Sequence, residues 1–344
     1  MRVLITGGTG LIGKATAERL LHKGWQVRVI DRHIPPEAIL DGAEYAECDI
    51  LNYADLLAQT RGCDAIIHMA AIRSPVLAPG VDIFEVNVAG TFNVFEAAAE
   101  SGIKRVAQAS SINALGSYYG IQEVRPPYFP IDEQQPSFTT DPYSFSKKMV
   151  EDIGQYYWRR CGISSVAMRY PGVYRPEMVT SEGFLNKRRL FRDLLAELDA
   201  LPVAELKARM ADANQRAQAF RIEHYLEFRD GQQPPSRGKF TDDPLFWSYV
   251  GDRFNFWAII DVRDAAQSLE KGITADYDGA HPLYINDRVN ALGADTQTMI
   301  HLFFPDTHEL KSDLSGSTSL VSIDKARALI GYEPEHSLDT LASP

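Results

Sequence analysis

A glycine-rich turn near the N-terminus, in the run VLITGGTGLIG, constrains the fold more than any other feature of the sequence. Gly7, Gly10 and Gly13 stand three residues apart between an apolar strand and an amphipathic helix. This spacing allows a tight turn, close approach of the backbone to a pyrophosphate, and close packing of helix on strand. The start of the helix also offers unpaired N–H groups and the positive end of its dipole to phosphate. The run therefore predicts a dinucleotide site, with Leu11 and Ile12 beside the glycines.

Short apolar runs alternate with helical segments through the first half of the chain. The expected strands are 3–6, 26–30, 65–69, 106–110 and 165–169. Between them lie amphipathic stretches, such as 12–22 and 83–99, with apolar residues three or four apart. Such alternation implies right-handed βαβ crossovers and a parallel sheet covered on both faces. We therefore predict a Rossmann-type, doubly wound α/β fold, with an NAD-binding domain over residues 1–176.

The pattern changes after about residue 175, where a helical insertion is expected over 177–253. Residues 184–229 are highly charged and predict two helices with Pro202 at the break. The expected apolar faces are Leu190, Leu194, Leu198 and Leu201 on the first helix and Leu206, Met210, Ala213, Ala217 and Phe220 on the second. A Gly/Pro-rich link follows at 230–239. We interpret the insertion as a cap over the active site or a dimer surface, and a solvated helical arm is the alternative.

The remainder of the chain is expected to complete the fold. Residues 256–260 predict a strand that returns to the sheet, and a helix follows from Val262, so that about 254–274 belong to the nucleotide-binding domain. The last part, 275–344, is assigned to a smaller C-terminal substrate-binding region.

The composition excludes several classes of partner. A formal net charge of −11 argues against nucleic acid, because a phosphate backbone attracts basic faces. Cys48, Cys63 and Cys161 show no metal-ligand spacing, so we expect no metal site and a reduced, cytoplasmic compartment. No stretch approaches the roughly 18 apolar residues that cross a bilayer, and no basic leader precedes the first strand, so no membrane partner is expected.

Acidic residues at two strand ends bear on the choice of cofactor. Asp31 ends the second strand, where a carboxylate can accept hydrogen bonds from both ribose hydroxyls and would repel a 2′-phosphate. NAD is therefore favoured over NADP, although Arg32 could accommodate the phosphate. Asp49, followed by Ile50, could bind the adenine, or it could cap the helix that begins near Tyr53.

Small residues after the expected strand at 65–69 complete the predicted cofactor site. In the run HMAA, Met69, Ala70 and Ala71 would let the chain pass under the pyrophosphate. His68 at the strand end is more often structural than catalytic.

Tyr143 and Lys147, in the run YSFSK, share one face at the start of a predicted helix. An adjacent ammonium stabilises a phenolate, so Tyr143 could exchange a proton with a substrate hydroxyl. Lys147 could also bind the nicotinamide ribose. Ser111, at the end of the expected strand at 106–110, could hydrogen-bond the reacting oxygen, and Ser110 is the alternative. The serines have no acid or base partner for nucleophilic hydrolysis.

These motifs together resemble a known family. TGGTGLIG, the aspartate after the second strand, HMAA, VNVAGTFNV, ASSINALG and YSFSK occur in the order found in extended short-chain dehydrogenases/reductases. The sequence resembles their NAD-dependent epimerase/dehydratase branch, which includes nucleotide-sugar epimerases and uronate dehydrogenase. The similarity covers about residues 1–176 and resumes at FWAIIDVRDAAQSLEKGI and SIDKARALIGYEPEHSL.

The resemblance implies roles for individual residues. Tyr143 would transfer the proton, with Lys147 and Ser111 assisting, and the distance in sequence to Gly116 favours Ser111 over Ser110. Further cofactor contacts would include Ser110, Asn87 and Tyr170, with an internal helix contact as the alternative for Asn87. The family also implies a homodimer formed through two helices of the nucleotide-binding domain.

Departures from the family pattern bear on the substrate. In RYPGVYRP, Gly172 replaces the asparagine that approaches the diphosphate in nucleotide-sugar epimerases. Trp257 stands where the family has a diphosphate-binding arginine, and Arg253, four residues earlier, could compensate. Dehydratases of the branch carry Asp-Glu after the catalytic hydroxyl residue, and Ile112-Asn113 cannot supply that chemistry.

A smaller polar substrate, such as a sugar, sugar acid or sugar lactone, therefore competes with a nucleotide sugar. The expected substrate contacts are Arg73, Ser74, Ser111, Ile112, Asn113, Tyr143 and Gly172. Arg73 could bind a carboxylate or be a surface residue. The first hypothesis is an NAD-dependent oxidoreductase that transfers hydride at a secondary alcohol of a sugar-like molecule. The alternatives are a nucleotide-sugar epimerase and a dinucleotide-binding protein without chemistry.

Overall fold

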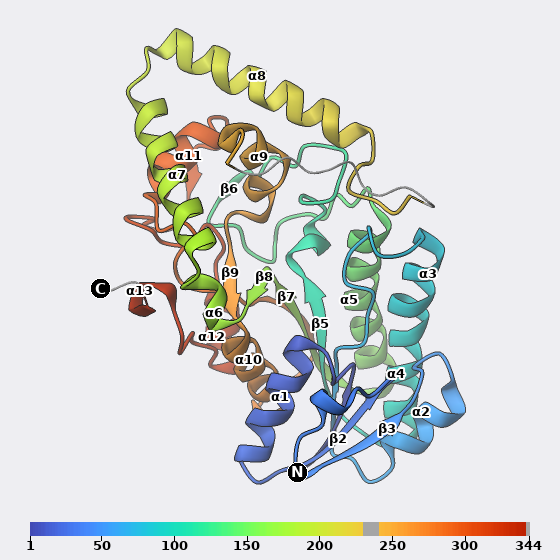
Figure 1. Cartoon of the computed structure of the whole chain (residues 1–344). Coiled ribbons are helices and arrows are strands. Elements are labelled where there is room, and N and C mark those ends of the chain that lie inside the picture. The colour runs from blue at the N-terminus through green and yellow to red at the C-terminus, as the bar shows by residue number, and fades with distance from the viewer. Residues whose placement is uncertain (230–240, 342–344) are drawn as a thin grey trace.

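A seven-stranded parallel sheet forms the centre of the computed structural model, which describes residues 1–229 and 241–341 (Figure 1). The strand order is β10-β7-β5-β4-β1-β2-β3, and every neighbouring pair is parallel. The strands are β1 (Arg2–Thr6), β2 (Gln26–Asp31), β3 (Ala43–Glu47), β4 (Ala65–His68), β5 (Arg105–Ser111), β7 (Ser164–Tyr170) and β10 (Ala280–Tyr284). The predicted doubly wound fold is confirmed.

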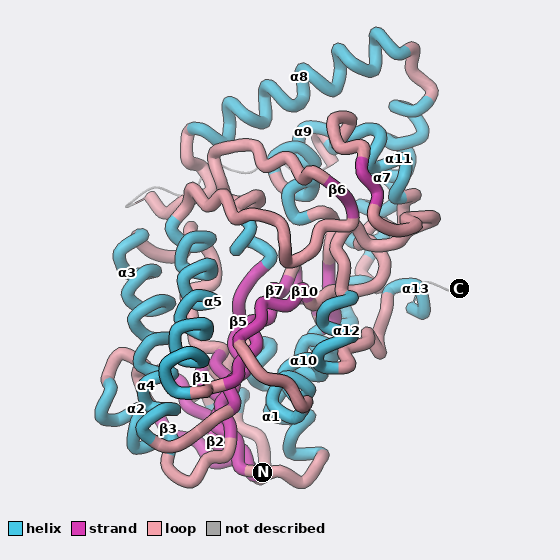
Figure 2. The backbone as a smooth tube through the Cα atoms, turned by 180° about the vertical axis from the view of Figure 1, so that it is seen from behind, coloured by secondary structure: helices cyan, strands magenta, loops and turns pink. Residues whose placement is uncertain are grey.

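Helices cover both faces of the sheet (Figure 2). One face packs against α1 (Leu11–His22) and α10 (Val262–Thr274), the other against α2 (Tyr53–Thr60), α4 (Gly90–Glu100) and α5 (Pro142–Cys161). The alternation of β1 explains this division, because successive side chains of a strand point to opposite faces. Val3 and Ile5 join the core under α1 and α10, whereas Leu4 joins the core under α2, α4 and α5.

The expected helix over 83–99 is three consecutive segments. These are α3 (Gly80–Phe84), the π-helical turn η2 (Glu85–Ala89) and α4. The short turn η1 (Pro36–Ala38) lies between β2 and β3, and η3 (Ile112–Leu115) follows β5 directly.

Two strands of the sheet, β3 and β10, were absent from the prediction, and one predicted strand lies elsewhere. Residues 256–260 do not return to the main sheet, since β9 (Ile259–Asp261) pairs with β8 (Gly172–Tyr174) and with no other strand of the described residues. The physical reason is that Phe256 and Trp257 have left-handed backbone conformations, with φ of 54° and 46°, which an extended strand does not accommodate. Because β10 pairs with β7, the region after residue 275 contributes an edge strand to the main sheet.

The insertion packs against the C-terminal region in a second core. Its helices are α6 (Pro176–Val179), α7 (Glu182–Asp199), α8 (Val203–Ile222), α9 (Pro244–Val250) and the turn η4 (Asp252–Asn255). Phe191, Leu194, Leu198 and Met210 are buried there, and Leu190 is not, because Phe191 takes the inward position. The predicted break at Pro202 is confirmed, and the predicted link at 230–239 lies outside the described residues.

Two further elements contribute to this second core, namely β6 (Tyr128–Phe129), which pairs with β11 (Glu309–Leu310), and α11 (Thr296–Phe303). In contrast, α12 (Asp324–Ile330) packs in the core under α1 and α10, and α13 (Leu338–Leu341) packs in a small separate cluster with Tyr174. Within the described residues, no helix combines the length and the apolar character that a membrane crossing requires.

Candidate active site

A cavity of about 670 Å³ opens at the carboxyl ends of the central strands, where doubly wound folds bind their ligands. Its wall runs from the glycine turn after β1 past the ends of β2 and β4 to the end of β5 and the start of α5. Of the predicted cofactor and catalytic residues, it contains Gly7, Gly10, Leu11, Ile12, Gly13, Asp31, Arg32, Asp49, Ile50, Met69, Ala70, Ala71, Ser110, Ser111, Tyr143, Lys147 and Tyr170.

The glycine turn is built as the spacing predicted. Gly7 has a φ of +65°, and a Cβ atom there would lie 2.5 Å from the backbone nitrogen of Ala70. A Cβ atom on Gly13 would lie 2.6 Å from the carbonyl oxygen of Gly7. Gly10 begins α1 without a side-chain cap, so the first N–H groups of the helix face the cavity. This cradle fits the pyrophosphate of a dinucleotide.

The carboxylate of Asp31 is oriented at the end of β2 by its neighbours. Its Oδ2 accepts a hydrogen bond from the Thr9 hydroxyl at 2.6 Å, and its Oδ1 accepts one from the Arg32 backbone N–H at 2.9 Å. Oδ2 also accepts a hydrogen bond from the Thr9 backbone N–H at 3.3 Å, whereas Oδ1 keeps a second lone pair for a ribose hydroxyl, so the geometry fits NAD. Thr9 was not predicted, although it lies within the quoted motif.

The structure does not show Asp49 as the cap of the helix that begins at Tyr53. The side chain of Asn52, rather than Asp49, accepts a hydrogen bond at the start of α2. The Oδ1 of Asp49 accepts from the Leu51 N–H at 2.9 Å, and Asp49 lies in the cavity wall. This position is compatible with an adenine contact.

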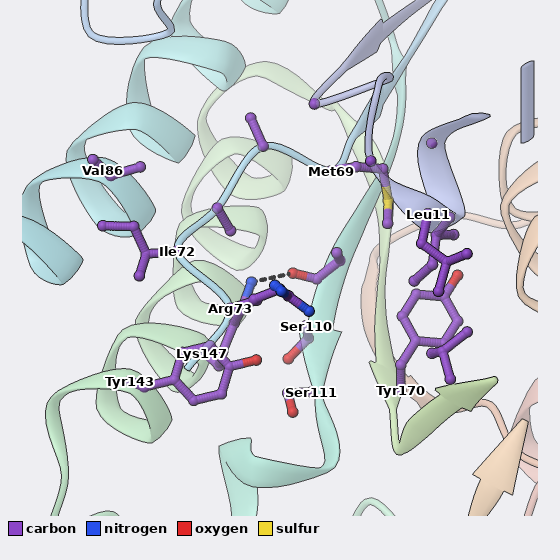
Figure 3. Close-up of a pocket in the computed structure, with 18 of the residues that line it drawn as sticks. Leu11, Met69, Ile72, Arg73, Val86, Ser110, Ser111, Tyr143, Lys147 and Tyr170 are labelled. Carbon is purple, nitrogen blue, oxygen red and sulfur yellow. Dashed lines mark hydrogen bonds between the residues drawn. The ribbon is translucent and has the colours of Figure 1, made fainter. Parts of the chain in front are cut away.

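Ser111 and Tyr143 meet at the junction of β5 and α5 (Figure 3). Helix α5 begins here because Asp141 caps it, accepting a hydrogen bond from the Ser144 N–H at 2.8 Å, and Pro142 occupies its first turn. The Tyr143 hydroxyl points toward Ser111 and interacts with it by a side-chain hydrogen bond. Both side chains are buried. A substrate oxygen placed between them would contact two hydroxyl groups.

The electrostatics of this pair differ from the expectation. Burial raises the pKa of the Tyr143 phenol, and the hydrogen bond with Ser111 opposes that rise only in part. The expected stabilisation of phenolate by Lys147 is not seen, because the ammonium lies 5.9 Å from the ring centroid of Tyr143 and donates to the carbonyl oxygen of Ala109 at 2.9 Å. Burial also lowers the pKa of Lys147 to about 8, with Glu151 acting in the opposite direction.

The two adjacent serines have different partners. The Ser110 hydroxyl donates to Glu151 at 2.7 Å, and Glu151 forms two hydrogen bonds of 2.8 Å with Arg169. Ser111 has no carboxylate partner among the described residues: besides Tyr143, its oxygen accepts a hydrogen bond from the Asn113 backbone N–H at 3.1 Å. The structure therefore favours Ser111 as the hydroxyl that meets substrate.

Three predicted contacts lie outside the cavity wall. The Asn87 amide is occupied internally, with its Nδ2 donating to the Ile72 carbonyl and the Ser146 hydroxyl, both at 2.9 Å, so the alternative reading of Asn87 holds. Ile112 is buried in the second core, and Ser74 accepts a weak hydrogen bond from the Val76 N–H at 3.4 Å. His68 is also internal, between the hydroxyls of Thr6 and Thr91.

The substrate end of the cavity combines predicted and unpredicted residues. Arg73, Asn113 and Gly172 line it as expected, together with four residues that the sequence did not single out: Tyr118, Tyr119, Asp252 and Asn255. The Tyr119 ring packs edge-on against Tyr143, with centroids 5.7 Å apart. The aromatic pair in SYYG, directly after the catalytic serine motif, was the available signal for two of them.

The insertion and the C-terminal region contribute few residues to the wall of the cavity. Asp252 is the only described residue of 177–253 that lines the cavity, and none of residues 275–341 does. The expected compensation by Arg253 is wrong. Its side chain is buried, donates to the Phe303 carbonyl at 2.8 Å and pairs with Glu123 at 2.7 Å.

Comparison with known proteins identifies the family of the chain. A sequence model described as the NAD dependent epimerase/dehydratase family matches residues 3–210. Uronate dehydrogenase from Pseudomonas syringae pv. tomato is 32% identical over 168 residues, which are 49% of this chain and 58% of that protein. A putative UDP-glucose 4-epimerase from Methanocaldococcus jannaschii is 31% identical over 185 residues, which are 50% of this chain and 56% of that protein. The chain thus spans less than three fifths of these relatives.

Solved structures share the fold over nearly the whole chain. UDP-glucose 4-epimerase from Thermotoga maritima superposes with a TM-score of 0.61 at 18% identity, covering 98% of this chain and 95% of that one. A mutated uronate dehydrogenase gives a TM-score of 0.57 at 17% identity, covering 98% and 83%. Both matches extend through the insertion.

Proposed function

The chain belongs to the NAD dependent epimerase/dehydratase family, a family of enzymes, and we propose that it is an NAD-dependent dehydrogenase of a small sugar or sugar acid. The reaction is oxidation of a secondary alcohol, or its reverse. The observation that favours a small substrate over a nucleotide sugar is the internal position of Arg253, which therefore does not replace the diphosphate-binding arginine of the family.

Few cations face the described part of the cavity. They are Arg32, Arg73 and Lys147. Arg32 lies beside Asp31 at the ribose end, and Lys147 donates to a backbone carbonyl, which leaves Arg73 at the substrate end. One guanidinium suits a single carboxylate or a group of hydroxyls better than a diphosphate. Asp252 and Asn255 in the same wall can accept or donate hydrogen bonds with sugar hydroxyls.

The chain's own residues supply the proton chemistry. Ser111 donates a hydrogen bond to the reacting oxygen and stabilises its developing charge. In its phenolate form Tyr143 accepts the proton of the substrate hydroxyl during oxidation, and the resulting phenol returns that proton during reduction. Bound NAD supplies the hydride acceptor. The glycine cradle and Asp31 hold the cofactor, and the Tyr119 ring narrows the space beside Tyr143.

A nucleotide-sugar epimerase is the second candidate, because the putative UDP-glucose 4-epimerase from Methanocaldococcus jannaschii is similar to the chain to nearly the same extent, with 31% identity over 50% of it. Purified protein should be incubated with NAD and, separately, uronic acids, neutral sugars, L-threonine and UDP-glucose. L-Threonine is included because pig L-threonine 3-dehydrogenase is 33% identical over 177 residues. Net NADH formation on a sugar or sugar acid supports the proposal. Interconversion of UDP-sugars without NADH would refute it in favour of the epimerase.

Replacing Tyr143 with phenylalanine separates both enzymes from a dinucleotide-binding protein without chemistry. We expect turnover to fall by about 10²–10⁴-fold, since a positioned proton-transfer group contributes this much, while NAD still binds. Near-normal turnover in Tyr143→Phe would contradict the mechanism. Unchanged cellular function in that variant, with tight NAD binding, would favour the non-catalytic alternative.

The preference for NAD over NADP depends on Asp31. In Asp31→Ala the repulsion of a 2′-phosphate is removed and Arg32 remains, so the ratio of the two dissociation constants should shift toward NADP. Calorimetry with both dinucleotides measures this shift. Tighter binding of NADP than NAD by the unaltered protein would show that the assignment of the cofactor is wrong.

We further propose a cytoplasmic homodimer. Exposed aromatic side chains gather on α3, α4 and α5, where Phe84 stacks on Phe145 and Phe92 stacks on Tyr156, each pair at 6.1 Å. An exposed apolar stripe of this kind favours association of helices from two copies. Light scattering on the wild type and on Phe92→Lys tests the dimer, and the proposal predicts dissociation of the variant. The acidic charge and free cysteines support a cytoplasmic location.

A further inference from the structure

We propose that Arg221, on the inserted helix α8, is a positioning residue that holds the backbone of residues 117–121 and thereby the Tyr119 ring against Tyr143. The proposal rests on the proposed function for its effect on catalysis. The anchoring itself can be tested without any substrate.

Arg221 is a buried cation at the C-terminal end of α8, with 2% of its surface exposed. Its guanidinium donates to the carbonyl oxygens of Ser117 at 2.6 Å, Tyr118 at 3.0 Å and Val250 at 2.7 Å, and also to that of Gly120. It lies over the Phe254 ring, 4.1 Å from the centroid. Within the described ranges it forms no ion pair with a carboxylate, so backbone carbonyls take the place of a counter-charge.

The loop needs these donors because it has no regular secondary structure to pair its carbonyls. Residues 117–121 lie between η3 and β6 and belong to neither a helix nor a strand. Gln218, one turn before Arg221, adds a hydrogen bond of 2.6 Å to the Ile121 carbonyl. Buried carbonyl groups require such partners, and bonds from a charged donor are the stronger kind. Two side chains of α8 thus bind four of the five carbonyls in this loop.

The same loop reaches the catalytic residues on its other side. Tyr119 packs edge-on against Tyr143, and the ring planes are 89° apart. The hydroxyl of Ser117 donates to the Phe254 carbonyl at 2.7 Å, and a Cβ atom on Gly251 would lie 3.3 Å from the Tyr118 hydroxyl oxygen. Gly251 and Phe254 flank the cavity residue Asp252 on the chain. The loop therefore connects α8 with two parts of the cavity wall at the substrate end, namely Tyr143 and the segment that contains Asp252.

This arrangement assigns a role to the insertion that its sequence left open. Helix α8 crosses the top of the molecule in Figure 1, above α9, and does not itself line the cavity. Its influence passes through Arg221 to the loop and from the loop to Tyr119. A misplacement of about 1 Å near the reacting atoms can lower turnover by about 10²-fold.

Hydrogen exchange measured by mass spectrometry tests the anchor directly. Arg221→Lys keeps the charge but loses the forked geometry of the guanidinium, and Arg221→Met loses the charge and the donors. We expect faster exchange of the loop amides at 117–121 and of the first turn of α5 in both variants, with unchanged exchange in β1 and β2. Arg209→Met is the matched control, because Arg209 lies on the same helix and pairs with Glu197 at the surface. Unchanged loop exchange in the Arg221 variants would overturn the proposal.

Kinetics and cofactor binding then separate positioning from general destabilisation. For Arg221→Lys we expect kcat/KM to fall by roughly 10–10²-fold, while the NAD dissociation constant stays within about twofold, because Arg221 has no hydrogen bond to the glycine cradle. Adding Arg221→Lys to Tyr119→Leu should cost little more, since both changes remove the same contact. Additive losses, or a parallel loss of NAD affinity, would refute positioning through Tyr119.

If Arg221→Met does not fold, Gln218→Met replaces it in the exchange experiment. If the wild type oxidises no substrate, the proposed function fails and the exchange data still decide the anchor.

Discussion

Replacing Lys147 with methionine should make the protein more stable at neutral pH while it abolishes turnover. The ammonium of Lys147 is buried, and the opposing effect of the Glu151 carboxylate on its pKa is smaller than that of burial. Its pKa is lowered from the ordinary 10.5 to about 8. Since each pKa unit corresponds to about 1.4 kcal/mol, the charged lysine destabilises the native state by about 3 kcal/mol at pH 7.

Methionine has a similar length and no charge, so Lys147→Met removes this cost. It also removes the hydrogen bond to the Ala109 carbonyl, which offsets about 1.5 kcal/mol. We expect a net gain of about 2 kcal/mol in the free energy of unfolding, measured by urea denaturation at pH 7. Turnover should fall by about 10²-fold or more, because the variant lacks the ammonium that we expect to bind the nicotinamide ribose and so to position the cofactor.

The pH dependence checks the sign of this reasoning. Below pH 8 the lysine is charged in both the native and the unfolded state, and the cost is fully present. Between pH 8 and 10.5 the unfolded state binds the extra proton, so the stability of the wild type rises with pH. The advantage of Lys147→Met should therefore shrink over that interval.

A neighbouring lysine provides the control. Lys148 is paired with Asp152 at the surface, and Lys148→Met should change the free energy of unfolding by less than about 0.5 kcal/mol. If Lys147→Met is less stable than Lys148→Met at pH 7, burial of the Lys147 ammonium does not destabilise the native state and the reasoning fails.

Two further predictions concern the sheet and the cofactor cradle. Burial lowers the pKa of His68 to about 3, so the native state keeps it neutral while the unfolded state gains a proton below 6.5. Stability should fall by about 2 kcal/mol between pH 6.5 and 5, and urea unfolding of His68→Asn should lose clearly less over that interval. Gly13→Ala places a Cβ atom 2.6 Å from the backbone of Gly7 and Gly8, so calorimetry should show NAD bound at least about tenfold more weakly. Gly183→Ala, where a Cβ atom meets nothing within 4 Å, should bind NAD normally, and equal affinities in both variants would contradict a strained cradle.

Local sequence predicted those parts of the site that are built from one segment. The glycine turn, Asp31 and the pair Tyr143/Lys147 depend on a strand end or a helix start, and their spacing alone places them at the cavity. Nothing in the local sequence indicates the positive φ of Phe256, because aromatic residues rarely adopt a positive φ and a run of apolar residues predicts a strand.

Contacts between distant segments account for the other differences. Arg253 was expected at the substrate because of its position in the family pattern, yet Glu123, on a loop far earlier in the chain, binds it in the core. Tyr119 and Asp252 come together only because α8 and α9 fold over the loop after β5. Periodicity and motif spacing contain no information about such pairings, since these depend on how the inserted helices dock.

The register of α5 against β5 shows how local and distant signals combine at the catalytic centre. Tyr143, Lys147 and Glu151 are four residues apart and share one face of α5. That face contacts β5 at three successive points, namely Ser111, the Ala109 carbonyl and Ser110. A shift of α5 by one turn, about 5.4 Å, would break all three contacts at once. Glu151 also binds Arg169 at the end of β7, so an ion pair between neighbouring elements sets the position from which the Tyr143 hydroxyl meets Ser111.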